Sequence, residues 1–215
     1  MSTISWWKVN TPSCSPDELS DIITAPNGGY YTVPIDPYNE VYPNIYLGDG
    51  TTALCTSLLR RTGITHVLNA ACGKSKSLNL VNTNESFYRD SGIKFMGIEA
   101  LDMSTFLLLN HFHEAADFID SALTSGGKVY VHCRQGISRS ATLILAYLMI
   151  KKNYSAQEAV RTIRRQRDII PNDGFLKQLC LLNETLLLDR RLFEKTEAKL
   201  SCSTDCKPTQ SVLIK

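Results

Sequence analysis

The sequence predicts an α/β domain with a central, mostly parallel sheet flanked by helices. Short apolar runs of strand length alternate with longer stretches in which apolar residues recur at helical spacing. Strands and helices that alternate in this way pack as a mostly parallel sheet with helices on its faces. The chain has 215 residues, which is enough for one such domain with a substantial core.

Four apolar segments are expected to form the strands. Gly63 follows one expected helix, and Gly126 ends another, at positions where glycine commonly terminates helices. Pro43 interrupts the first strand segment. The expected strands are 41–48, 64–69, 93–98 and 128–132.

The expected helices have clear starts and stops. A helix at 52–62 precedes Gly63, and another covers 108–123. The run 141–150 is apolar nearly all round, so its helix should lie in the domain centre. Short capping patterns predict the remaining helices: Ser15 for a short N-terminal helix, the Ser155–Glu158 capping box, and Asn172 or Asp173 for a last helix ending near 188.

The chain divides into residues 1–35 as an N-terminal extension, 36–190 as the main domain and 191–215 as a flexible C-terminal tail. A net charge of +2 implies no general affinity for nucleic acid or membranes. No signal peptide is visible, and the longest apolar run is about half a bilayer span. We expect a cytoplasmic or nuclear location, with the oligomeric state left open.

Seven irregularly spaced cysteines indicate a reducing compartment rather than a disulfide framework or zinc site. Most are expected to be small, buried core residues. These are Cys14, Cys55, Cys72, Cys180, Cys202 and Cys206. The pair in the tail lacks neighbouring ligands, so no metal site is predicted, and no cofactor is expected.

Cys133 differs from the others because its neighbours build a phosphate cradle. Residues 131–140 read VHCRQGISRS, between an expected strand and an expected helix. Backbone N–H groups of such a loop, with the helix N-terminus, bind anions and favour a thiolate. Arg139 supplies a fork of donors that matches two phosphate oxygens. The Ser140 hydroxyl can stabilise the sulfur when it leaves phosphorus.

Residues 132–140 match the signature His-Cys-x-x-Gly-x-x-Arg-Ser/Thr, and the chain therefore resembles the protein tyrosine phosphatase superfamily. The continuation 140–149 is similar to the dual-specificity branch, and more narrowly to small atypical, VHR-type phosphatases. Supporting runs are 39–41, 63–70, 87–88, 115–120 and 171–175, so the resemblance covers roughly 36–184. It implies the cysteine-phosphatase fold, with 36–190 as the catalytic domain.

The resemblance implies a general acid, which should protonate the leaving oxygen. We expect Asp102 in this role, since VHR-type enzymes carry their acid in the corresponding loop. Without the resemblance, a helix cap or a solvated carboxylate would explain Asp102 equally well. Glu99 is the nearest rival and Asp90 a weaker one.

Supporting roles are expected beside the nucleophile. His132 should point away from the pocket and hold the cysteine loop by hydrogen bonds. Asn172 either ties a neighbouring loop down or only caps a helix. Arg167 either binds a second phosphate near the pocket or is a solvated residue of a basic helix.

The loop positions between nucleophile and arginine are expected to bind substrate. They are Arg134, Gln135, Gly136, Ile137 and Ser138. VHR-type loops commonly carry an acid where Gln135 stands and an aromatic where Ile137 stands, so these two departures bear on substrate preference.

The resemblance implies a phosphatase acting on phosphotyrosine and on phosphoserine or phosphothreonine through a phosphocysteine intermediate. Phosphorylated proteins are the expected partners, with mitogen-activated protein kinases as a family-level expectation. Two alternatives remain: a phosphate-binding module without turnover, and a lipid or RNA phosphatase of the same superfamily.

Overall fold

The computed structural model describes residues 14–203. Its sheet has five strands in the order β1-β2-β5-β3-β4, which are Tyr38–Tyr42, Ile45–Gly48, Val129–His132, His66–Asn69 and Lys94–Gly97. β1 pairs with β2 in antiparallel fashion, and the other neighbouring strands are parallel. The predicted α/β class with a mostly parallel sheet is confirmed.

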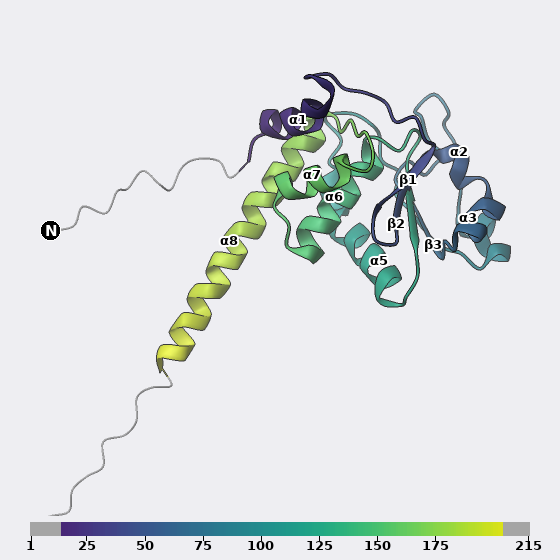
Figure 1. The fold of residues 1–215 in the computed structure, drawn as a ribbon. Coiled ribbons are helices and arrows are strands. Elements are labelled where there is room, and N and C mark those ends of the chain that lie inside the picture. The colour runs from purple at the N-terminus through teal and green to yellow at the C-terminus, as the bar shows by residue number, and fades with distance from the viewer. Residues whose placement is uncertain (1–13, 204–215) are drawn as a thin grey trace, which may run out of the picture.

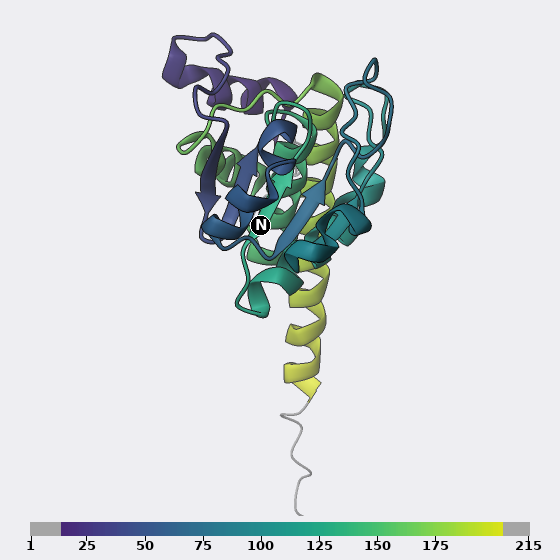
Figure 2. The same ribbon diagram turned by 90° about the vertical axis from the view of Figure 1, so that its right-hand side faces the viewer.

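Alternating side chains of the strands enter two separate cores. In β5, Val129 and Val131 face the larger core, whereas Tyr130 faces the smaller one. This period of two is expected for a sheet covered on both faces. In Figure 2 helices are seen in front of the strands and behind them.

The larger core is covered by α5 (Phe112–Thr124), α6 (Arg139–Lys152), α7 (Ala156–Arg164) and α8 (Asp173–Ser203). Every residue of α6 from Arg139 to Met149 is buried, so the prediction of a central helix is confirmed. The smaller core contains residues of α2 (Gly50–Ala53), α3 (Thr56–Thr62) and α4 (Glu85–Tyr88). Short 3-10 turns complete the chain at Ala25–Asn27, Arg89–Ser91 and Leu108–His111.

Two predicted elements are split in the structure. The expected strand 41–48 is a hairpin, because the chain turns at Pro43 and Asn44, and Asn44 adopts a φ of 63°. The expected helix 52–62 is interrupted between α2 and α3 at Leu54 and Cys55. Its predicted stop at Gly63 is confirmed, with a left-handed φ of 80°.

Helices lie at both ends of the described chain. Ser15 caps α1 (Pro16–Thr24), as predicted, and this helix packs against α7 and α8. The last helix continues to Ser203 instead of stopping near 188, and Figure 1 shows it running away from the domain body. The remainder of the expected tail, 204–215, and the first thirteen residues lie outside the described part.

The described residues contain no helix that is long and apolar enough to cross a membrane.

Candidate active site

The cysteine loop connects the carboxyl end of β5 to the start of α6. Gly136 adopts a φ of 70°, and a Cβ atom there would lie 2.3 Å from the Gly48 carbonyl oxygen. Only glycine fits so close to β2 with this backbone conformation. The glycine of the signature is therefore needed for packing the loop onto the sheet.

The carbonyl groups of this loop are held from outside. Gly50 N donates to Arg134 O at 3.1 Å, and Ile170 N donates to Ile137 O at 2.7 Å. A loop whose carbonyl groups bond outward can turn its N–H groups toward the centre, where they bind anions. Gly136 N does so and donates to the Cys133 sulfur at 3.3 Å.

Cys133 Sγ lies at the centre of this loop, and the residue is only 1% exposed. The Ser140 hydroxyl donates to the sulfur at 3.2 Å. Burial by itself raises the pKa of the thiol. The positive charge of Arg139 and the hydrogen bonds from Ser140 and Gly136 outweigh burial, so the pKa of Cys133 is lowered. The arrangement favours a nucleophilic thiolate.

The Arg139 guanidinium is 2% exposed and held by backbone carbonyl groups. Nη1 donates to Ala100 O at 3.0 Å, and Nη2 donates to Asn79 O at 3.3 Å. A terminal guanidinium nitrogen carries two hydrogens, so each keeps one for a phosphate oxygen. No sequence pattern predicted these two carbonyl groups, although asparagine suits the left-handed φ of 55° at position 79.

Asp102 contacts the cysteine loop, as expected for a general acid. Its Oδ1 accepts hydrogen bonds from Ser138 Oγ at 2.7 Å and from Asn172 Nδ2 at 2.9 Å. Its Oδ2 lies 3.4 Å from Arg139 Nε. The rivals lie elsewhere: Asp90 belongs to the turn after α4, and the Glu99 carboxylate lies beside Gly73.

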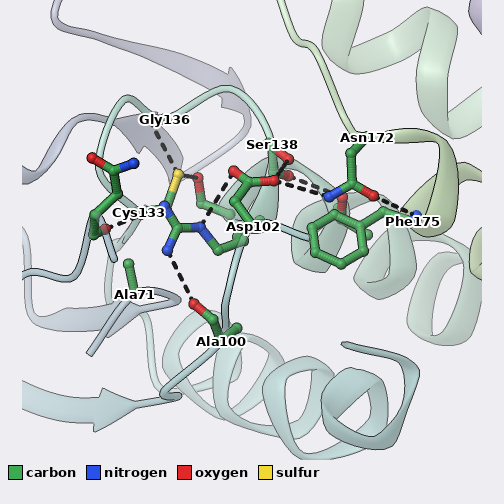
Figure 3. A network of polar contacts seen from close by, with 12 residues as sticks. Ala71, Ala100, Asp102, Cys133, Gly136, Ser138, Asn172 and Phe175 are labelled. Atoms are coloured by element: carbon green, nitrogen blue, oxygen red, sulfur yellow. Dashed lines mark hydrogen bonds and ion pairs between the residues drawn. The ribbon is translucent and has the colours of Figure 1, made fainter. Parts of the chain in front are cut away.

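Asn172 combines the two roles that the sequence left open. Its Nδ2 binds Asp102, and its Oδ1 accepts the backbone N–H of Phe175 at 3.0 Å. The side chain therefore caps α8 and ties the Asp102 loop to that helix (Figure 3).

The family model for the dual specificity phosphatase catalytic domain matches residues 45–185. The chain belongs to the dual specificity phosphatase family. The match includes the whole cysteine loop, Asp102 and Asn172, and it confirms the family expected from the signature.

Solved structures of other phosphatases are similar. Human DUSP28 shares 26% identity at a TM-score of 0.62, covering 73% of this chain and 99% of its own. A mouse putative dual specificity phosphatase, complexed with zinc tungstate, shares 29% identity at a TM-score of 0.62, covering 72% and 91%. PTPMT1 in complex with PI(5)P shares 22% identity at a TM-score of 0.62, covering 72% and 99%, and is similar in fold.

His132 of this phosphatase is buried and points away from solvent. Its Nδ1 lies 3.1 Å from the Cys133 carbonyl oxygen, and burial lowers the pKa of His132 to about 4. The imidazole is therefore neutral at physiological pH. It holds the backbone of the nucleophile and does not supply positive charge to the sulfur.

The expected second-phosphate role of Arg167 stays a prediction, because Arg167 lines a pocket beside the cysteine loop but is held on all sides by the protein. Arg167 is 4% exposed, and its five N–H groups have protein acceptors. Nε donates to Gly136 O, Nη1 to Asp36 O and Asn39 Oδ1, and Nη2 to Pro37 O and Gln135 O. The alternative, a solvated residue of a basic helix, is wrong, because Arg167 is buried. Arg167 clamps the outside of the cysteine loop to the segment before β1.

The remaining loop residues lie on the rim of the site. Arg134 and Gln135 are exposed, and Ile137 is half-buried. All three line a pocket of about 530 Å³ beside the cysteine loop, whose other wall is formed by residues 33–37. The Ser138 side chain donates to Asp102, and its expected contact with substrate stays a prediction.

Proposed function

We propose that this phosphatase hydrolyses phosphotyrosine and phosphoserine or phosphothreonine in proteins through a phosphocysteine intermediate. The observation that carries the proposal is the Cys133 sulfur, bound by Gly136 N and Ser140 Oγ beside the Arg139 guanidinium. The Asp102 carboxylate, 3.4 Å from Arg139 Nε, supports the proposal further, because cysteine-based phosphoryl transfer needs a proton donor beside the anion cradle.

In the first step the Cys133 thiolate attacks phosphorus, and the bond from phosphorus to the substrate oxygen breaks. Asp102, protonated at this stage, gives its proton to the leaving oxygen. The loop amides and the two free N–H groups of Arg139 bind the non-bridging oxygens. These donors are held in place before substrate arrives, so little reorganisation accompanies the reaction.

In the second step water attacks the phosphocysteine and the S–P bond breaks. Asp102, now ionised, accepts the proton of the attacking water. The Ser140 hydroxyl, 3.2 Å from the sulfur, donates to the departing thiolate. Inorganic phosphate then leaves, and the enzyme is restored without a metal ion.

The breadth of substrates is part of the proposal. The family match supports activity on phosphoproteins, and the rim residues Arg134, Gln135 and Ile137 are available to contact a peptide around the phosphorylated residue. Phosphorylated proteins, including mitogen-activated protein kinases, are the proposed partners, in the cytoplasm or nucleus.

The two alternatives find less support in the site. A phosphate-binding module without turnover would not need Cys133, Ser140 and Asp102 in these contacts. Lipid phosphatase activity has a fold-level parallel in PTPMT1, but the cysteine loop carries one exposed cation between nucleophile and arginine, Arg134. A polyanionic inositol phosphate is better matched by a loop that carries several cationic side chains.

The first experiment measures hydrolysis of a small aryl phosphate in the presence of a metal chelator, with Cys133→Ser as the paired variant. Turnover by the wild type and its loss in the variant support the proposal. Absence of turnover in the reduced wild type, with vanadate still binding, would overturn it in favour of a binding module.

A second experiment compares substrate classes at equal phosphate concentration. Phosphotyrosine, phosphoserine and phosphothreonine peptides of one sequence are assayed beside PI(5)P vesicles and a 5′-phosphorylated RNA. We expect the highest kcat/KM on the peptides. A higher value on vesicles or RNA would contradict the proposed protein substrate while leaving the catalytic mechanism intact.

A further inference from the structure

Two cysteines far apart in the sequence meet in the interior. Cys14 directly precedes the Ser15 cap of α1, and Cys180 lies on α8. Their sulfur atoms are 2.6 Å apart, although 166 positions separate them in the chain. Both residues are buried, with 3% and 7% exposure.

The contact follows from how α1 docks. Leu19 and Ile23 of α1 are buried in the larger core, which also contains Cys14 and Cys180. On the outer side Arg164 Nε donates to Ile23 O at 2.7 Å. Figure 1 shows α1 lying across the start of α8. The meeting of the sulfurs is therefore part of the docked position of the N-terminal helix.

The pair is separate from the catalytic centre. Cys133 is contacted by Gly136 and Ser140, and neither member of the pair enters those contacts. A metal site is not the explanation either, since residues 14–203 contain no cluster of three or more His, Cys, Asp or Glu that could hold an ion.

We propose that Cys14 and Cys180 are a thiol pair that a hydroperoxide oxidises to a reversible disulfide, which covalently joins α1 to α8. The Cys14 thiolate attacks one peroxide oxygen, the O–O bond breaks, and Cys14 becomes a sulfenic acid with release of hydroxide. The Cys180 sulfur then attacks the Cys14 sulfur and displaces the sulfenic oxygen, which leaves as water. Two thiols are oxidised, and one hydrogen peroxide is reduced to two waters.

The two sulfurs are not equivalent in this sequence of steps. The hydrogen bond between the two sulfurs lowers the pKa of Cys14 by more than burial raises it. The same hydrogen bond, together with burial, raises the pKa of Cys180. We therefore place Cys14 as the attacking thiol in the proposed steps, and Cys180 as the resolving thiol.

The disulfide would anchor the N-terminal end of the chain segment that leads to residues 33–37, which form one wall of the pocket beside the cysteine loop. After α1 the chain passes Asn27 and Thr32, whose side chains bind Asp168, and then forms the wall at 33–37. A bond at Cys14 fixes the beginning of this path, whereas the Asp168 contacts fix its middle. Oxidation thus stabilises the docked helix without using a catalytic group.

The test uses the full chain carrying Cys133→Ser, so that the catalytic thiolate does not consume peroxide. After brief treatment with hydrogen peroxide, non-reducing peptide mapping should find the Cys14 and Cys180 peptides joined, with a mass loss of two hydrogens. The midpoint of thermal unfolding should rise by roughly 5–10 °C and return after dithiothreitol.

Matched variants decide the outcome. Cys14→Ala and Cys180→Ala, each in the same background, should lose both the cross-link and the rise in unfolding midpoint. Cys55→Ala removes an exposed cysteine and should keep both. The proposal is overturned if peroxide converts Cys55 to a trappable sulfenic acid while the Cys14 and Cys180 peptides stay separate. It is also overturned if Cys14 is joined mainly to another cysteine.

Discussion

Arg139 and Arg167 are both buried at the cysteine loop, but the hydrogen-bond acceptors around their guanidinium groups differ. Arg139 has one carbonyl acceptor on each terminal nitrogen and keeps hydrogens for a phosphate. Arg167 has an acceptor for every N–H group, and two of these acceptors are carbonyl oxygens of the loop itself. The first arginine is proposed to bind the phosphate, and the second holds the loop from outside.

The difference shows that burial and charge do not identify a substrate-binding arginine. What matters is the number of donors that the protein leaves unused. Burial lowers the pKa of Arg167, but the guanidinium remains a donor to main-chain carbonyl groups. Substitutions of Arg139 and Asp102 should therefore affect mainly the reaction, whereas a substitution of Arg167 should affect mainly stability.

The largest effect is expected for Arg139→Lys, which keeps the charge but removes the fork. One transition-state donor is typically worth 10²- to 10³-fold, and two are lost, so kcat/KM should fall on the order of 10⁴-fold. Steady-state kinetics on an aryl phosphate measure this, with thermal unfolding as the check on folding. A loss below about ten-fold would show that charge alone suffices.

Asp102→Asn should lower kcat on phenyl phosphate by roughly 10²- to 10³-fold, because the leaving oxygen then departs without a proton. For a substrate whose leaving group is more acidic, the reduction in kcat should be smaller. Asp90→Asn, at an exposed turn outside the site, is the matched control and should change neither rate. An unchanged rate in Asp102→Asn would remove the assignment.

Arg167→Met tests the outer clamp. Several carbonyl groups lose their donor, so the free energy of unfolding should fall by about 3 to 4 kcal/mol, as measured by urea denaturation. The kcat/KM of the folded enzyme should fall less than in Arg139→Lys. Exposed Arg165→Met is the matched control and should be nearly neutral. A variant of normal stability that binds only doubly phosphorylated peptides more weakly would instead support the second-phosphate role.

The smallest expected effect is a loss of stability at low pH, caused by protonation of His132. Its folded-state pKa of about 4 lies below the ordinary 6.5, so the unfolded chain binds the proton more readily. The contribution of neutral His132 to the free energy of unfolding is fully present above pH 6.5. It should fall by up to about 3 kcal/mol as the pH drops toward 4. Urea denaturation across this range measures it in the Cys133→Ser background, since the lowered pKa of Cys133 would add its own loss on acidification. His132→Asn should abolish most of the slope, and an equal slope in both proteins would contradict the assignment.

Much of the fold was accessible from the sequence because its signals are local. The capping box at Ser155, the stop at Gly63 and the all-apolar helix after the loop each act within a few residues. The predicted element boundaries were wrong where no nearby residue marked a turn or a helix end clearly. Asn44 turns a single expected strand into a hairpin, and α8 continues beyond the end that its sequence indicated.

The sequence by itself determined the catalytic loop, because nucleophile, glycine, arginine and serine lie within eight residues and their spacing dictates one geometry. The tertiary structure decided which groups complete it. Asp102, Asn172 and Arg167 come from separate segments, as do the carbonyl groups that orient Arg139. The meeting of Cys14 and Cys180 was equally invisible in the sequence. Contacts between distant segments depend on how helices dock on the sheet, and that packing leaves no fixed spacing in the chain.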